Sequence, residues 1–147
     1  MDATSAIRNA RVADAAEIAR LSAQLGYPAS IDVVSARLQR LLGSPAHAVM
    51  VTAGGGESLA GFIALEQRIT LELGERVEIV GLVVDANARR AGAGRLLVAA
   101  AERWTADRGL DEVFLRSNVV RLEAHPFYEG LGYTRTKTQH AYRKRLA

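Results

Sequence analysis

The stretch Val83–Leu97, with the sequence VVDANARRAGAGRLL, runs from an apolar strand through a turn of small residues into the start of a helix. The helix is predicted over Ala93–Arg108, because apolar residues recur there three and four positions apart and Gly109 follows as a stop signal. The first N–H groups of a helix have no partner within it and lie at the positive end of its dipole, so they favour an anion such as pyrophosphate. Gly92 and Gly94 leave the backbone accessible to such a ligand. The same two glycines would also suit a helix that only starts close against a sheet, so the anion site needs further support.

Two common glycine-rich phosphate loops do not match this stretch. A Walker loop has Lys and then Ser or Thr after its last glycine, whereas Arg95 and Leu96 follow Gly94 here. A dinucleotide-binding loop has Gly or Ala three residues further on, where this chain has Leu97. The sequence therefore argues against both classes.

Another phosphate-binding signature does match. The pattern Arg89-x-x-Gly92-x-Gly94, directly after an apolar strand, resembles the CoA-pyrophosphate signature of the GNAT family of N-acetyltransferases. The segment 124–133, AHPFYEGLGY, is similar to a second signature of that family, in which a short helix ends in Phe-Tyr-Glu before a glycine and an aromatic residue. The resemblance implies acetyl-CoA as co-substrate and the following cofactor-binding residues: Leu82, Val83, Val84, Arg89, Arg90, Ala91, Gly92, Ala93, Gly94, Arg95, Asn118 and Phe127.

The rest of the chain predicts a sheet flanked by helices. Hydrophobic periodicity and turn residues indicate strands over 6–9, 48–53, 59–67, 76–84 and 113–116, helices over 14–25, 30–42, 93–108 and 122–130, and a terminal hairpin over 133–146. Asp14 and Ser30 are the expected caps of the first two helices. We expect one N-acetyltransferase domain over residues 1–147, of mixed α/β (α+β) class. The GNAT resemblance implies a mostly antiparallel sheet of six to seven strands, splayed central strands and about four helices.

Amine acetylation needs a base for the ammonium proton and an acid for the departing thiolate. The resemblance implies Glu78 as the base, because it stands on the strand that leads to the phosphate turn. It implies Tyr128 as the acid, since the family places this phenol beside the CoA sulfur. The alternatives are a surface carboxylate on an alternating strand for Glu78 and aromatic packing for Tyr128. The chain has no Cys and no other poised nucleophile, so we expect direct attack in a ternary complex, and the oxyanion donor is expected to be a main-chain N–H near Val83 or Val84.

Residues just before the second signature carry a finer resemblance. The run Asn118–Arg121, followed by Glu123-Ala124-His125, is similar to aminoalkylphosphonate N-acetyltransferases, whose substrates are small anionic amines. Arg121 is then either an anion contact or an ion-pair partner of Glu123 or Glu129. His125 is a secondary candidate, either structural or a substrate contact.

Composition limits the remaining choices. The chain has no Cys, 49% hydrophobic and 24% charged residues, and a net charge of +3. Because the chain has no Cys, thiolate zinc sites are excluded, and we expect no metal site. No apolar run approaches the length of a membrane span, and no apolar signal segment begins the chain, so we expect no membrane span and a cytoplasmic location. The expected partners are CoA and a small-molecule amine, and no nucleic acid is expected. The sequence leaves both a monomer and a homodimer as alternatives. The competing functions are a non-catalytic acyl-CoA-binding regulatory module on the same fold and a nucleic-acid-binding domain that uses the basic tail.

Overall fold

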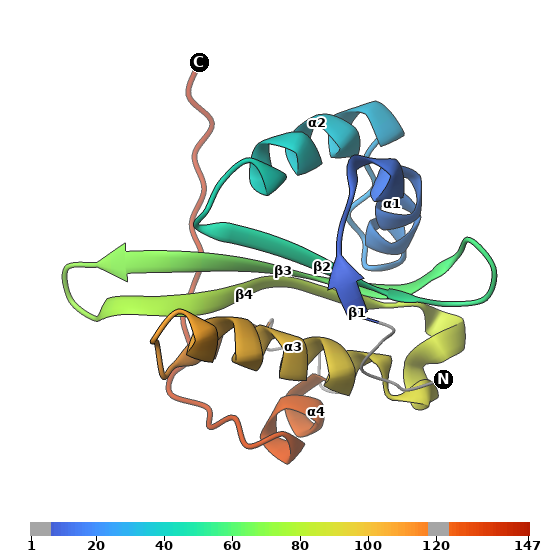
Figure 1. The fold of residues 1–147 in the computed structure, drawn as a ribbon. Coiled ribbons are helices and arrows are strands. Elements are labelled where there is room, and N and C mark those ends of the chain that lie inside the picture. The colour runs from blue at the N-terminus through green and yellow to red at the C-terminus, as the bar shows by residue number, and fades with distance from the viewer. Residues whose placement is uncertain (1–6, 118–123) are drawn as a thin grey trace. The chain divides into compact units, whose positions relative to one another are not determined.

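The structure is a computed structural model that describes residues 7–117 and 124–147, without the side chains of residues 89–91. The chain divides into two units, Met1–Leu115 and Arg116–Ala147, and each is described by itself. The first unit contains β1 (Ile7–Asn9), the 3₁₀ turn η2 (Val12–Asp14), α1 (Ala15–Gln24), α2 (Ile31–Leu42), β2 (His47–Ala53), β3 (Leu59–Thr70), β4 (Gly74–Val84), the 3₁₀ turn η3 (Ala86–Ala91), α3 (Ala93–Asp107) and β5 (Val113–Leu115) (Figure 1). The second unit contains α4 (Ala124–Gly130).

The first unit is a sheet between two helical layers. Its strands lie in the order β1-β2-β3-β4-β5, and each neighbouring pair is antiparallel except β4 and β5. Those two strands are parallel because α3 connects them as a crossover. Helices α1 and α2 cover one face of the sheet and α3 covers the other (Figure 1). The predicted mixed, mostly antiparallel sheet is confirmed.

Both faces of the sheet are packed with apolar side chains. On the side of α1 and α2, one buried cluster contains Ile18, Leu21, Val34, Leu38, Val49, Val51, Phe62 and Val83. On the α3 side, Leu97 and Ala101 are 0% exposed. Gly61 of β3 permits this close packing, because a Cβ there would lie 2.7 Å from the Val83 carbonyl oxygen and 3.1 Å from Leu97 Cδ1. The close approach fixes β4 and α3 against the centre of the sheet.

The two predicted helix caps have different outcomes. The Ser30 hydroxyl accepts a hydrogen bond from Val33 N at 3.2 Å, as expected for a cap of α2. Asp14 precedes α1 but makes no cap hydrogen bond to it. Its carboxylate accepts from Arg11 N at 2.8 Å and pairs with Arg8 at 2.8 Å, so the predicted Asp14 cap is wrong. The carboxylate instead stabilises the 3₁₀ turn before α1 and joins it to β1.

The predicted terminal hairpin over 133–146 is also wrong. The structure assigns no strand to these residues, all of which are described, and their side chains are exposed except that of Tyr133, a residue half-exposed beside α4. A hairpin needs an apolar face to bury, and this segment offers mainly Thr, Lys and Arg. The described sheet therefore has five strands rather than six or seven. No helix of the described residues is long and apolar enough to cross a membrane.

Candidate active site

The pairing of β4 with both neighbouring strands changes at Val80. Over Val77–Ile79, β4 pairs with Val113–Leu115 of β5. The register with β3 then shifts, since Ile79 lies opposite Leu65 and Gly81 lies opposite Ala64. Val80 is thus the extra residue of a β-bulge, a feature that bends a strand and often ends a pairing.

Beyond the bulge, β4 stays paired with β3 but not with β5. The β3 ladder continues to Val84, opposite Gly61, whereas the described residues form no β4–β5 pair after Ile79. This end of the β4–β5 pairing coincides with the end of β5 at Leu115. It leaves one backbone edge of Leu82–Val84 facing away from β3, and Val83 itself is buried while its two neighbours are half-buried. An extended chain could pair with such an edge as an additional strand would.

The chain turns from β4 into α3 through η3 and Gly92. Gly92 has φ 84° and ψ 11°, in the left-handed region that favours glycine, and a Cβ at this position would meet nothing within 4 Å. The first intrahelical bond of α3 runs from Leu96 N to Gly92 O at 3.1 Å. The preceding N–H groups, of Ala93, Gly94 and Arg95, therefore lack partners within α3. The turn has the open backbone and the positive helix end that an anion requires.

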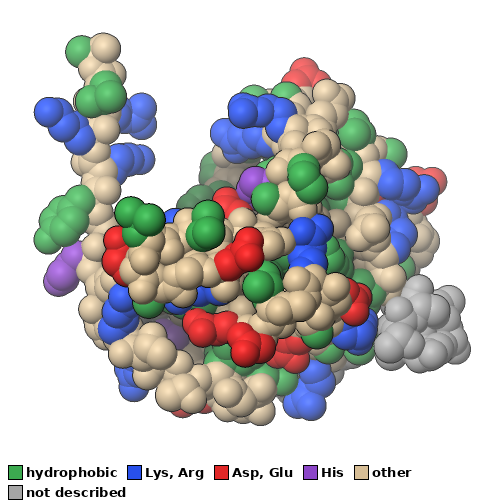
Figure 2. Space-filling model, turned by 60° about the vertical axis from the view of Figure 1, so that its left-hand side comes forward, with side chains coloured by type: hydrophobic (Ala, Val, Ile, Leu, Met, Phe, Trp, Pro, Cys, Tyr) green, Lys and Arg blue, Asp and Glu red, His purple; other side chains and the backbone are tan. Residues whose placement is uncertain are grey.

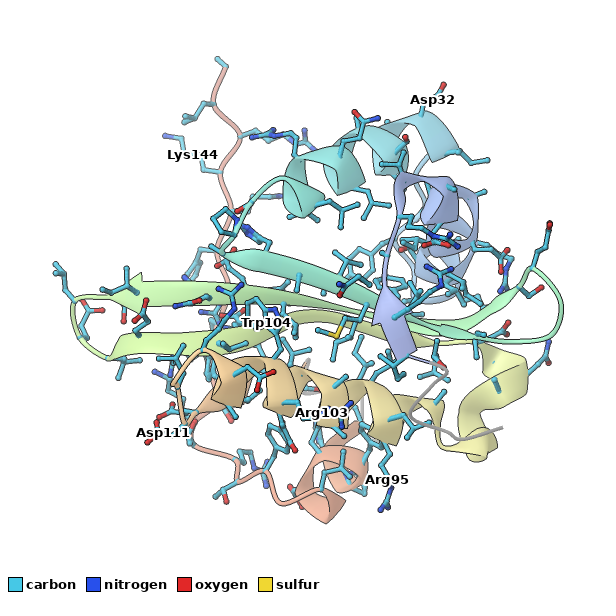
Figure 3. The ribbon with its side chains drawn as sticks, viewed as in Figure 1. Asp32, Arg95, Arg103, Trp104, Asp111 and Lys144 are labelled. Carbon is cyan, nitrogen blue, oxygen red and sulfur yellow. The ribbon has the colours of Figure 1, made fainter. Side chains whose placement is uncertain are left out.

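Three arginines, Arg89, Arg90 and Arg95, are predicted to supply positive charge at this turn. Arg95 is exposed and points away from the sheet (Figure 3). The backbone of Arg89, Arg90 and Ala91 forms η3, but their side chains lie outside the described residues. Asn118 also lies outside the described residues.

Glu78 is buried in an ion pair one strand pleat before the bulge. It is 7% exposed, and its Oε1 accepts a hydrogen bond from Arg68 Nη1 at 2.6 Å. The interpretation of Glu78 as a surface carboxylate is wrong, because the residue is buried and its side chain lies on the face of the sheet that α1 and α2 cover. The register places Glu78 opposite Glu66. Glu66 is four residues from Phe62 on β3, so its side chain lies on the same face as Phe62 and the buried cluster.

The ion pair belongs to a longer polar chain. Arg68 Nε also contacts Glu66 Oε1 at 3.2 Å, and Glu66 Oε2 contacts His47 Nε2 at 3.1 Å. His47 Nδ1 in turn lies 2.9 Å from Ser44 Oγ. The hydrogen bond to Glu78 raises the pKa of the Arg68 guanidinium, which stays charged. This polar chain was not predicted from the sequence. Glu66 and Arg68 stand two residues apart on β3, and the β3–β4 register places Glu66 opposite Glu78 and Arg68 opposite Arg76, so only the register brings Arg68 near Glu78.

Tyr128 lies in α4 of the second unit. Its half-buried ring packs edge-to-face against Phe127, with centroids 5.1 Å apart, and against Tyr133, with centroids 6.2 Å apart. Gly132, with φ 94°, ends this segment, and Tyr128 O accepts hydrogen bonds from Leu131 N and Tyr133 N. Half-buried His125 belongs to the same helix, whereas Arg121 lies outside the described residues. The aromatic packing fixes the backbone from which the phenol projects.

A cavity of about 310 Å³ lies elsewhere in the first unit, at the opposite edge of the sheet. Its lining comes from β1, β2 and α3 and includes Arg8, Met50, Arg103 and Trp104. None of the predicted site residues lines it. The bulge in β4 and the turn before α3 contribute no residue to its lining.

Comparison with known proteins agrees with this geometry. A sequence model of the Acetyltransferase (GNAT) family matches residues 15–133. The chain is 30% identical over 135 residues to an aminoglycoside N(6')-acetyltransferase type 1 of Stenotrophomonas maltophilia, an alignment that covers 89% of this chain and 87% of the relative.

Solved structures share the fold at lower identity. The aminoglycoside N-acetyltransferase AAC(6')-Iy in complex with CoA has a TM-score of 0.84 at 23% identity, over 95% of this chain and 94% of that one. A transcriptional regulator from Bacillus halodurans C-125 also has a TM-score of 0.84, at 22% identity, over 94% of this chain and 98% of that one. The chain belongs to the GNAT family of acetyltransferases and is an N-acetyltransferase that uses acetyl-CoA as co-substrate to acetylate an amine.

Proposed function

We propose that this enzyme acetylates a primary amine of a small molecule by direct attack in a ternary complex. The observation that carries the proposal is that the β4–β5 pairing ends at Ile79, beside the bulge at Val80, while the β3–β4 pairing continues to Val84. It leaves a free backbone edge between a buried carboxylate, Glu78, and the anion-binding turn at Gly92. A thioester arm paired with this edge would have its phosphates at one end and a base near the other.

The co-substrate site that we propose has two parts. The free edge of Leu82–Val84 supplies main-chain groups for the pantetheine arm. The first turn of α3, at Ala93–Arg95, supplies N–H groups for the pyrophosphate, and Arg89, Arg90 and Arg95 supply positive charge. Asn118 and Phe127 complete the proposed set.

In the proposed chemistry Glu78 takes a proton from the incoming ammonium, directly or through water, and the free amine attacks the thioester carbon. A C–N bond forms, the C–S bond breaks, and Tyr128 gives its phenolic proton to the departing sulfur. The nitrogen then loses its second proton to the Tyr128 phenolate, directly or through water, which leaves a neutral amide and restores the phenol. Arg68 holds Oε1 of Glu78, and among the described residues no hydrogen bond occupies Oε2. That second oxygen is the proposed proton acceptor.

We propose an aminosugar as the first acceptor class to test. The relative that is 30% identical bears the name of an aminoglycoside acetyltransferase. The polar chain around Glu78 contains two carboxylates, Glu66 and Glu78, and one guanidinium, Arg68, which favours a cationic acceptor over an anionic one. An aminoalkylphosphonate is the competing acceptor, and Arg121 would be its contact.

In Figure 2 acidic and basic side chains are interspersed over the main body of the visible face, and the narrow terminal segment carries Lys and Arg without acidic neighbours. Such a segment is smaller than the broad basic surface typical of nucleic-acid binding. We therefore propose no nucleic-acid partner. We also propose a single acetyltransferase domain and a cytoplasmic location. Both a monomer and a homodimer are compatible with this proposal.

The test is a thiol-release assay with acetyl-CoA and a panel of aminoglycosides, aminoalkylphosphonates, peptide N-termini and lysine derivatives. We expect turnover with at least one small primary amine, and a Tyr128→Phe variant that binds CoA normally but has a kcat lower by about 10²-fold. Tight CoA binding without turnover on any amine would favour the regulatory-module alternative. A Tyr128→Phe enzyme as fast as the wild type would remove the acid assignment alone.

A further inference from the structure

Helix α1 is bonded to the beginning of the phosphate turn. Arg20 Nη1 donates to Asp85 Oδ2 at 3.0 Å, and Gln24 Nε2 donates to Asp85 Oδ1 at 3.4 Å. The Gln24 side-chain oxygen also accepts from Ala86 N at 3.0 Å. Arg20 and Gln24 are four residues apart, so they lie on the same side of α1. Two consecutive residues of the turn are thus held by one helix face.

Asp85 passes this restraint to the turn. Its Oδ1 accepts from Asn87 N at 3.1 Å, and its backbone oxygen accepts from Ala88 N at 2.8 Å, so it begins η3. Its own N–H donates to Ala60 O of β3 at 2.7 Å. The hydrogen bonds from Asn87 and then from Arg20 lower the pKa of the Asp85 carboxyl, which is therefore a carboxylate at neutral pH.

Arg20 is itself held in place on the other side. Its Nε and Nη2 donate to the two carboxylate oxygens of Glu17, both at 2.9 Å, and Nη2 also donates to Leu59 O at 3.1 Å. Glu17 Oε1 accepts from Leu59 N at 2.8 Å. The planar guanidinium thus bridges α1, the start of β3 and the end of β4, a geometry that a lysine cannot reproduce.

A turn of this kind needs outside support. Hydrogen bonds in a 3₁₀ turn have poor geometry, and Ala86 and Asn87 are exposed. In addition, a carboxylate at Asp85 without its cation would repel the phosphates expected at the same turn. Arg20 addresses both needs, since it restrains the turn and partly neutralises Asp85.

We infer that Arg20 and Gln24 are positioning residues for acetyl-CoA, which act through Asp85 to hold the turn that binds its phosphates. The inference rests on the proposed assignment of this turn to the co-substrate. It makes α1 a part of the co-substrate site that does not itself touch the ligand.

The test compares Arg20→Met and Gln24→Met with Arg37→Met and Gln39→Met, which change the same residue types at exposed positions of α2. CoA affinity is measured by calorimetry well below the unfolding midpoint of each variant, and KM for acetyl-CoA is measured alongside kcat. Arg20→Met and Gln24→Met should each raise the Kd of CoA and the KM of acetyl-CoA about 10-fold, with kcat at saturation unchanged. Arg20→Lys should recover only part of the loss.

A double variant separates positioning from general destabilisation. If Arg20 acts through Asp85, then Arg20→Met combined with Asp85→Asn should weaken CoA binding no more than the stronger of the two single changes. If Arg20→Met folds poorly, Gln24→Met still tests the inference, because Gln24 is exposed and its replacement should not disturb the fold. Unchanged Kd in both Arg20→Met and Gln24→Met, or an equal rise in the α2 controls, would overturn the inference.

Gly92→Ala distinguishes this inference from the proposed site. Its Cβ would enter the open space at the turn from a left-handed backbone position. If Gly92→Ala leaves CoA binding unchanged, the turn does not bind the phosphates and the proposed site fails. If Gly92→Ala weakens binding while Arg20→Met and Gln24→Met do not, only the inference about α1 fails.

Discussion

Gly61→Ala tests whether the close packing at the centre of the sheet controls both stability and the site. The new Cβ would lie 2.7 Å from Val83 O, a separation that real Cβ atoms essentially never show, and 3.1 Å from Leu97 Cδ1. Val83 O belongs to the backbone of the β3–β4 ladder and cannot rotate away as a side chain would. Either β4 or α3 must therefore move.

The expected cost follows from two opposing effects. Overpacking of a well-filled core costs about 1–3 kcal/mol, whereas replacing glycine by alanine recovers about 0.4–1 kcal/mol through the unfolded chain. The net loss in unfolding free energy is then about 1–2 kcal/mol. For a chain of this length, this lowers Tm by roughly 2–8 °C.

The same displacement should reach the co-substrate, because Val83 lies on the free edge of β4. We expect a rise of about 3-fold or more in the KM of acetyl-CoA. Thermal and urea unfolding measure the first effect, and steady-state kinetics measures the second.

Gly55→Ala is the matched control, because its Cβ would meet nothing within 4 Å and its φ is not positive. It should leave Tm unchanged or slightly higher. The reasoning is refuted if Gly61→Ala is as stable as the Gly55→Ala control.

Three further predictions concern the base, the partly buried Arg8–Asp14 ion pair and a helix cap. Glu78→Gln should lower kcat by about 10²-fold or more with CoA affinity unchanged, and Arg68→Met should lower kcat less; equal turnover of Glu78→Gln and wild type would exclude Glu78 as the base. The Arg8 hydrogen bond lowers the pKa of the Asp14 carboxyl, so its contribution to stability is complete above about pH 5 and disappears as the pH falls through the lowered folded-state pKa. Urea unfolding between pH 7 and 3 should therefore show a weaker pH dependence for Arg8→Met than for wild type, and parallel curves would contradict this. Ser30→Ala should lower the unfolding free energy by about 1 kcal/mol, which calorimetry would detect as a Tm lower by roughly 2–4 °C; an unchanged Tm would show that the cap contributes nothing.

Features that depend on neighbouring residues were predictable. The apolar spacing in Ala93–Arg108 predicted α3 to within one residue, and Gly92 was expected at the turn where the structure shows a left-handed φ. Ser30 was expected to cap α2, and three consecutive glycines after Ala53 were expected to connect β2 and β3. Each of these rests on backbone preferences within a few residues.

Features that depend on a partner elsewhere in the chain were not. The predicted hairpin over 133–146 failed, because strand formation needs a neighbour and an apolar face as well as suitable residues. Asp14 has the residue type of a helix cap, but Arg8 and the N–H of Arg11 compete successfully for its carboxylate. In both cases local preference was overridden by available contacts.

The sequence by itself predicted that a strand leads through a glycine turn into a helix whose backbone suits an anion. The kind of co-substrate followed from the resemblance of this stretch and of residues 124–133 to two signatures of the GNAT family. Only the tertiary structure decided which partners the residues of the proposed site have. The bulge at Val80 depends on the β3–β4 register, the burial of Glu78 depends on its pairing with Arg68, and the contact between Arg20 and Asp85 joins residues 65 positions apart. Such contacts follow from how strands and helices pack, which no local pattern along the chain specifies.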